Sequence, residues 1–203
     1  MVEKVLAADM VVWMDTVQYT KGGFTNRNRL PDGSWLTVPL AHGYTFAPIN
    51  RVRIGKPRGD WREYAVDRLQ RAWPSETTDK VCEQISRGYP LLVGLNAAIL
   101  DILLHTLRYK GEQHWQSHLD EAHAVLAVSD EEARLAPISE RIAQMVYDLG
   151  GDVYLSGPSG RHYLSERPFM ELGVRVEYWQ HEGPNPCTLE RIAPHRGRAT
   201  HYQ

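Results

Sequence analysis

The sequence is poor in the features that mark several classes of protein. It has two cysteines, Cys82 and Cys187, which are too few for a disulfide framework and too far apart for a zinc knuckle. It has no apolar run of about eighteen residues, so we expect no membrane span. The first residues include an acidic Glu3 and no long apolar stretch, so we expect no signal peptide and a cytoplasmic location.

Motifs for common cofactors are also missing. The sequence contains no Walker loop, no dinucleotide-binding glycine pattern, no nucleophile elbow, no kinase signature and no Cys-x-x-Cys pair. We therefore predict neither a cofactor nor a bound metal. The formal net charge of −2 argues against a protein that binds polyanions over its whole surface.

What is present is the composition of a globular domain, with 203 residues of which 42% are hydrophobic and 24% charged. This length predicts a single domain over residues 1–180, followed by an irregular basic tail over residues 181–203. Strand-like and helix-like segments alternate after residue 45, which predicts an α/β fold with a mainly parallel sheet flanked by helices. A β-hairpin is expected near the N-terminus, around the turn Pro31-Asp32-Gly33.

Apolar periodicity gives the expected elements. The expected strands cover residues 10–14, 24–30, 35–40, 48–54, 152–155 and 174–179. The expected helices cover residues 3–8, 61–73, 77–88, 91–109, 137–149 and 162–172. Residues 112–133 are polar and rich in histidine, which favours a solvated and partly helical linker.

Polar residues follow the first expected strand, which is a continuous apolar run that ends on Asp15. In open α/β sheets ligands bind at the carboxyl ends of the strands. Asp15, Gln18, Asn26 and Arg27 are therefore candidate catalytic residues, and Asn28 is a candidate ligand contact. Asparagine is disfavoured within strands, so Asn26 and Asn28 are expected to be present for another reason, although Arg27 also fits a merely solvated position.

A second candidate site is the loop Ser156-Gly-Pro-Ser-Gly-Arg161, which follows an expected strand. Backbone N–H groups in such a loop can surround an anion, and Arg161 can pair with a phosphate or carboxylate. An ordinary strand-to-helix connection explains the same residues equally well.

Other chemistry is less well supported. His114 and His118 are spaced for one helix face, but His123 falls off it, so a metal site is not favoured. His181 and His195 lie in the aperiodic tail, where no pattern indicates their role. The six tryptophans are mostly expected in the core, while Trp35 and Trp179 lie near loops where a ring can stack on a sugar or a base.

Several segments in sequence order resemble the WbqC-like protein family. They are the segment from Asp9 to Tyr19, the run Asn26-Arg-Asn-Arg29, the run Trp35-Leu-Thr-Val-Pro39 and the block from Gly151 to Leu164. Residues 61–73 and Asn96 fall in the order that the family shows. The last residues differ from the family's usual ending.

The resemblance implies a role in the biosynthesis of surface polysaccharides or small molecules, since members are generally encoded among such genes. It adds Asn96 and Tyr154 to the candidate ligand contacts. The usual hypothesis for the family is a transfer reaction on an amino sugar or a nucleotide-linked sugar.

We therefore expect a transferase that joins an acyl or aminoacyl group to an amine or hydroxyl of an activated, anionic or nucleotide-linked small molecule. Asp15 would act as base, with Gln18, Asn26 and Arg27 orienting the substrate. The expected ligand contacts are Asn28, Asn96, Tyr154, Ser156, Gly157, Gly160, Arg161 and Tyr163.

Two alternatives remain open. One is a module that binds a nucleotide or phosphate ester without reaction. The other is a nucleic-acid-binding protein, since residues 19–62 hold eight lysines and arginines but two aspartates. Nucleic acid is the less favoured partner because the rest of the chain is acidic enough to cancel that charge.

Overall fold

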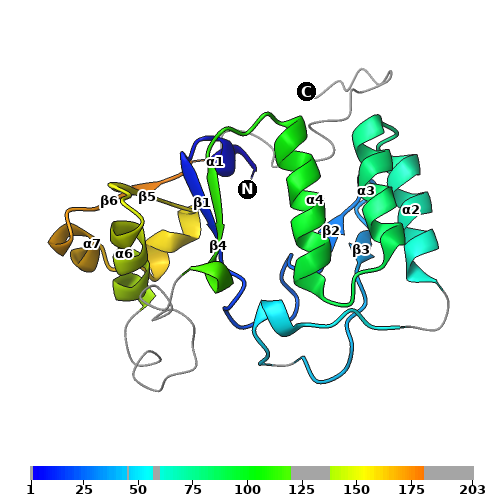
Figure 1. Cartoon of the computed structure of the whole chain (residues 1–203), viewed down its shortest axis with the longest axis horizontal. Helices are drawn as coiled ribbons and strands as arrows, with labels where there is room; N and C mark the ends of the chain where they lie inside the picture. Colours follow the sequence, from blue (N-terminus) through cyan, green and yellow to red (C-terminus); the bar gives the residue numbers. More distant parts are fainter. Residues whose placement is uncertain (1, 45, 57–59, 120–137, 181–203) are drawn as a thin grey trace. The chain divides into compact units, whose positions relative to one another are not determined.

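Figure 1 shows the fold in a computed structural model, which describes residues 2–44, 46–56, 60–119 and 138–180. The chain divides into two compact units. Within the described residues, the first unit contains residues 2–17, 110–119 and 138–180, and the second contains residues 18–109. Each unit mixes helices with short strands, which confirms a mixed α/β protein with small parallel sheets and an antiparallel pair near the N-terminus.

Two parallel strand pairs form the sheets of the first unit. β1 (Met10–Trp13) pairs with β4 (Glu112–Trp115), and β5 (Val153–Ser156) pairs with β6 (Arg175–Tyr178). All four residues of β1 are half-buried, so this strand is less enclosed than its apolar sequence predicts. The described strands lie in two-stranded pairs, whereas the sequence predicted one mainly parallel sheet.

Three of the described helices belong to the first unit, and two of them contribute to its core. The three are α1 (Val2–Leu6), α6 (Ile138–Asp148) and α7 (Arg167–Glu171). Ala143 of α6, Phe169 of α7 and the fully enclosed Val174 form a buried cluster, against which the β5–β6 pair packs through Tyr154 and Val176. The α7–β6 connection is short because Gly173 takes a positive φ of 74°.

The second unit packs three helices against a hairpin. The hairpin consists of β2 (Arg27–Arg29) and β3 (Trp35–Thr37), and the helices are α2 (Trp61–Ala72), α3 (Glu76–Arg87) and α4 (Leu92–Thr106). Their shared core contains residues from every one of these helices and from the hairpin turn. Its buried members are Leu30, Ala65, Leu69, Trp73, Val81, Cys82, Ile85 and Leu95.

Side-chain caps explain where two of these helices begin. The Asp60 carboxylate accepts a hydrogen bond of 2.9 Å from the backbone N–H of Arg62, as the sequence predicted for the start of α2. The Ser75 hydroxyl accepts one of 3.2 Å from the backbone N–H of Thr78 and so caps α3. Gly88 then ends α3 with a φ of 78°.

Two expected elements are wrong. Residues 48–54 were expected to form a strand, but Ile49–Arg51 form a 3₁₀ helix, with isolated bridges on either side. Residues 112–118 were expected in a polar linker, but residues 112–115 form β4, because pairing with β1 satisfies their backbone despite their polar side chains. Hence His114 is on a strand and His118 ends a 3₁₀ helix, so the two do not share a helix face.

Some expectations concern residues that the structure does not describe. His123, His181, His195 and the tail over residues 181–203 lie outside the described residues. Among the helices that are described, none has the length and apolar character to cross a membrane.

The cap of α3 generates a test of this local structure. We expect Ser75→Ala to lower the free energy of unfolding by about 1 kcal/mol, because the backbone N–H of Thr78 loses its acceptor. Urea denaturation followed by circular dichroism measures this. As a matched control, Lys80→Ala removes only the exposed 2.7 Å ion pair with Glu76 and should change stability by less than about 0.5 kcal/mol. Equal effects of the two substitutions would contradict this explanation of the helix start.

Candidate functional site

The carboxyl end of the β5–β6 pair collects several polar side chains. Ser156 and Tyr178 are register partners at the last position of each strand, and the backbone N–H of Trp179 donates to the Ser156 carbonyl at 2.9 Å. The loop that follows Ser156 continues into a 3₁₀ helix at Pro158–His162. Because the strands are parallel, this loop and the chain beyond Tyr178 leave the sheet at the same edge.

Close packing fixes the course of this loop. Ser156 is 1% exposed, and its hydroxyl lies against the backbone of Gly160. A Cβ at Gly160 would stand 2.1 Å from Ser156 Oγ, so any larger residue at this position would clash. Gly157, in contrast, has a φ of −75° and nothing near its missing Cβ. The sequence suggested a glycine loop for anions, but the requirement for Gly160 is steric.

Arg161 extends from this loop over an aromatic ring. Its guanidinium carbon lies 4.2 Å from the centroid of the Tyr178 ring, a cation–π contact. Within the described residues Arg161 forms no ion pair with a carboxylate, although its side chain is exposed. Its charge is therefore available to an anion that approaches the end of the sheet.

Glu166 occupies the other end of the same tyrosine. The Tyr178 hydroxyl donates a hydrogen bond of 2.9 Å to a Glu166 carboxylate oxygen. Desolvation and this carboxylate raise the pKa of the Tyr178 phenol, and the positive charge of Arg161 opposes the shift. The Tyr178 phenol therefore stays protonated. The Arg161 guanidinium lies over its ring and the Glu166 carboxylate binds its hydroxyl.

Two further tyrosines stand beside this group. Tyr154 stacks on Phe169 with ring centroids 5.3 Å apart, and burial raises the pKa of its phenol. Tyr163 is 58% exposed and follows the 3₁₀ helix. Tyr154 is thus mainly a packing residue, whereas Tyr163 offers an exposed ring.

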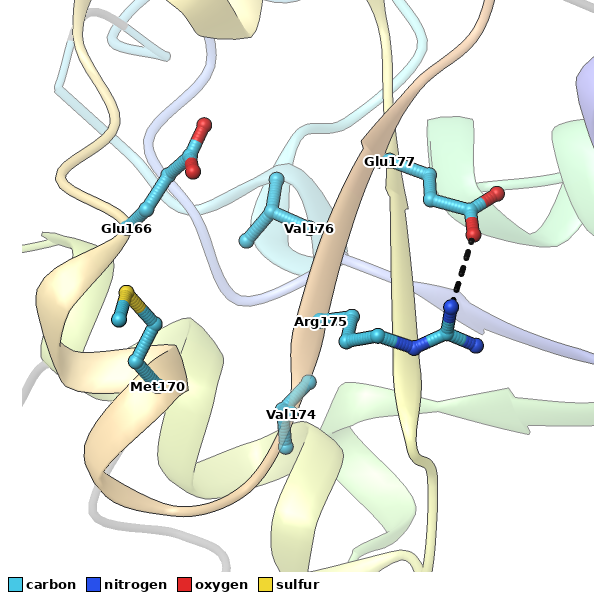
Figure 2. A pocket seen from close by; sticks show the side chains of 6 residues that line it. All are labelled: Glu166, Met170, Val174, Arg175, Val176 and Glu177. Carbon is cyan, nitrogen blue, oxygen red and sulfur yellow. Dashed lines mark ion pairs between the residues drawn. The ribbon is translucent and has the colours of Figure 1, made fainter.

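A pocket of about 310 Å³ lies next to these residues, along β6. Figure 2 shows Glu166, Met170 and Val176 on one side of the strand and the Arg175–Glu177 ion pair on the other. Its lining residues are Glu166, Met170, Val174, Arg175, Val176 and Glu177. Glu166 belongs both to the pocket and to the hydrogen bond with Tyr178, so it connects the two.

Asp15 lies at the carboxyl end of the other parallel pair. It is 4% exposed, and both of its carboxylate oxygens accept hydrogen bonds from Ser117, one from the backbone N–H at 2.9 Å and one from the hydroxyl at 2.6 Å. Ser117 follows β4, so this carboxylate ties the ends of β1 and β4 together. A structural role accounts for each hydrogen bond that Asp15 forms.

The polar residues before the hairpin form a network within the second unit. The Asn26 amide accepts from the Tyr19 hydroxyl at 2.8 Å and donates to the Val38 carbonyl at 2.9 Å. The Asn96 amide donates to the Thr25 carbonyl at 2.9 Å and so attaches α4 to the same segment. These two asparagines therefore satisfy backbone groups of the second unit.

Arg27, Asn28 and Gln18 differ in their surroundings. The Arg27 guanidinium donates to the carbonyls of Gly22 and Gly23 and so closes the loop before β2. Asn28 is exposed, and its amide oxygen accepts from the backbone N–H of Arg29 at 2.9 Å. The backbone of Gln18 forms an isolated bridge with Pro48.

The predicted site residues thus fall into two groups. Asp15 and the residues from Tyr154 to Tyr163 belong to the first unit, whereas Gln18, Asn26, Arg27, Asn28 and Asn96 belong to the second. A catalytic site shared by these groups stays a prediction. Sequence reasoning missed Glu166 and Tyr178. The period-two pattern of residues 174–179 predicts a strand and the side of it on which Tyr178 lies, but it does not predict that Tyr178 pairs with Ser156.

These observations define a mixed α/β protein that gathers an arginine, a carboxylate and tyrosines where two parallel strands end. Comparison with known proteins gives the family. The family model described as "WbqC-like protein family" matches residues 2–187, and the chain belongs to this family.

A curated relative is the "Uncharacterized protein Rv1507c" of Mycobacterium tuberculosis strain H37Rv. It is 25% identical over 185 residues, which cover 86% of this chain and 74% of the relative. No solved structure matches the chain.

The packing of Gly160 on Ser156 generates the second prediction. We expect Gly160→Ala to destabilise the protein by about 1–3 kcal/mol, because the added methyl overlaps Ser156 Oγ. Gly157→Ala is the matched control and should have little effect, since its position is open. The double variant Ser156→Ala/Gly160→Ala should recover part of the loss. Thermal denaturation measures all three, and equal stability of the two glycine variants would contradict the steric explanation.

Proposed function

We propose that the protein is a transferase that moves an acyl or aminoacyl group to an amine or hydroxyl of an activated small molecule. The anionic portion of this small molecule binds at the carboxyl end of the β5–β6 pair. The observation that carries this proposal is the Arg161 guanidinium, which stacks on Tyr178 beside the exposed Tyr163 and has no carboxylate partner among the described residues. Membership of the WbqC-like family is consistent with the proposal.

The chemistry of Arg161 favours phosphate or carboxylate groups. A guanidinium presents paired N–H donors that match two oxygens of such an anion. Stacking on Tyr178 holds the guanidinium carbon 4.2 Å from the ring centroid, so less side-chain freedom is lost when an anion binds. The loop that carries Arg161 is itself fixed by the contact between Ser156 and Gly160.

Glu166 is the candidate proton acceptor for the transfer. In acyl transfer, the acceptor nitrogen or oxygen forms a bond to the acyl carbon, the bond to the leaving group breaks, and the acceptor loses a proton. Glu166 lines the pocket and keeps one carboxylate oxygen on the Tyr178 hydroxyl. The other oxygen can take the proton while Arg161 holds the anionic part of the substrate.

Asp15, Asn26 and Arg27 then stabilise their own units and are not the reacting groups of this proposal. Both oxygens of the buried Asp15 carboxylate already accept hydrogen bonds from Ser117. Asn26 and Arg27 are engaged with backbone carbonyls of their own unit. Their substitution should lower stability as well as any activity.

Arg161→Ala tests the binding step. The probes are inorganic pyrophosphate, nucleoside diphosphate sugars and acyl phosphates, measured by thermal shift and calorimetry. We expect the affinity for the anion to fall about tenfold to a hundredfold, because a charge-assisted hydrogen bond contributes about 1.5–3 kcal/mol. Arg167→Ala is the control, since Arg167 is exposed and pairs with Glu171 at 2.7 Å. Unchanged binding in Arg161→Ala would contradict the proposed site.

Glu166→Gln separates a transferase from a binding module. With an acyl donor and an amine acceptor, product is followed by mass spectrometry while binding is followed by calorimetry. We expect product formation to fall by at least about a hundredfold, the typical contribution of a general base, while anion affinity is retained. A wild-type protein that retains an anion but yields no product with any donor would instead identify a module that binds without reaction.

A further inference from the structure

The hairpin of the second unit has two unlike faces. The register places Arg29 opposite Trp35 and Arg27 opposite Thr37, so these four side chains share one face. Leu36 projects from the opposite face and packs against the buried core of the unit. The face with the arginines therefore points away from the core.

Two arginines on this face form cation–π contacts with the same tryptophan. The guanidinium carbons of Arg27 and Arg29 lie 4.1 Å and 4.9 Å from the centroid of the Trp35 ring. Neither arginine has a carboxylate partner among the residues that the structure describes. Elsewhere in this unit Arg71 and Arg87 each pair with a glutamate or aspartate at 2.7 Å.

An exposed phenylalanine completes this surface. The Phe24 ring is 72% exposed, and its centroid lies 5.6 Å from that of Trp35. Phe24 thus adds an exposed aromatic ring beside two arginines that have no carboxylate partner among the described residues. We name Phe24, Arg27, Arg29 and Trp35 the hairpin face.

The two arginines are held to different degrees. Arg27 donates to the carbonyls of Gly22 and Gly23 and so keeps a fixed position over Trp35. The Arg29 side chain contacts the Trp35 ring, and within the described residues its guanidinium forms no hydrogen bond or ion pair with the protein. Arg29 is thus the member of the hairpin face that can give its donors to a ligand.

We propose that the hairpin face binds a nucleoside phosphate, with the phosphates on Arg29 and the base against Phe24. A guanidinium matches phosphate oxygens, and an aromatic side chain is a surface on which any base can stack. This site belongs to the second unit and does not depend on the anion site at Arg161. A free nucleotide fits better than a nucleic acid strand, because a strand needs a line of several cations, whereas this face offers two.

Calorimetry on the full chain tests this proposal. The probes are uridine diphosphate, inorganic pyrophosphate and a fifteen-nucleotide single strand. Uridine diphosphate is expected to bind, and Arg29→Ala and Phe24→Ala should each weaken it about tenfold, in keeping with about 1–3 kcal/mol for stacking or a phosphate contact. Pyrophosphate lacks a base, so its binding should respond to Arg29→Ala but not to Phe24→Ala. Arg71→Ala is the control and should leave all affinities unchanged.

Three results would overturn the proposal. The first is equal binding of uridine diphosphate by wild type, Arg29→Ala and Phe24→Ala. The second is loss of that binding in Arg161→Ala alone, which would assign the nucleotide to the anion site at Arg161 and exclude the hairpin face. The third is much tighter binding of the single strand than of uridine diphosphate, which would identify a nucleic-acid surface. Thermal denaturation checks that Arg29→Ala and Phe24→Ala leave the fold unchanged.

Discussion

The contact between Ser156 Oγ and the backbone of Gly160 is the constraint on which the candidate site depends. The loop after β5 packs so closely here that a Cβ at residue 160 would stand 2.1 Å from Ser156 Oγ. The next residue, Arg161, lies over the ring of Tyr178, which is the register partner of Ser156. The packing of Gly160 therefore accounts for one glycine of this loop, and a ligand contact by the loop stays a prediction.

The hydrogen-bond partners of the polar residues divide structural from functional candidates. Asp15 and Asn26 have their hydrogen-bonding groups engaged by protein atoms, so burying them is compensated within the fold. Arg161 and Arg29 instead rest on aromatic rings and have no carboxylate partner in the described part of the chain. Arginines kept charged and in place without a protein counter-ion are suited to anionic ligands.

Local signals in the sequence predicted much of the fold and part of the site. The caps at Asp60 and Gly88 and the turn at residues 31–33 were correct because each depends on a few adjacent residues. β4 was missed because its stability comes from pairing with β1, some hundred residues earlier in the chain, and its polar residues carry no apolar pattern. Glu166 was missed for a similar reason. It accepts a hydrogen bond from Tyr178, which lies twelve residues later in the chain, beyond α7.

The most direct test of this account observes the guanidinium of Arg161 itself. In heteronuclear NMR spectra of arginine side chains, the Nε–Hε resonance of Arg161 can be assigned by its loss in Arg161→Lys and followed while glucose 1-phosphate is added. Our account predicts that this resonance shifts with saturation, while that of Arg167, already paired with Glu171, stays in place. An unmoved Arg161 resonance at concentrations where other arginines shift would contradict the central claim that this residue binds the anionic part of the substrate.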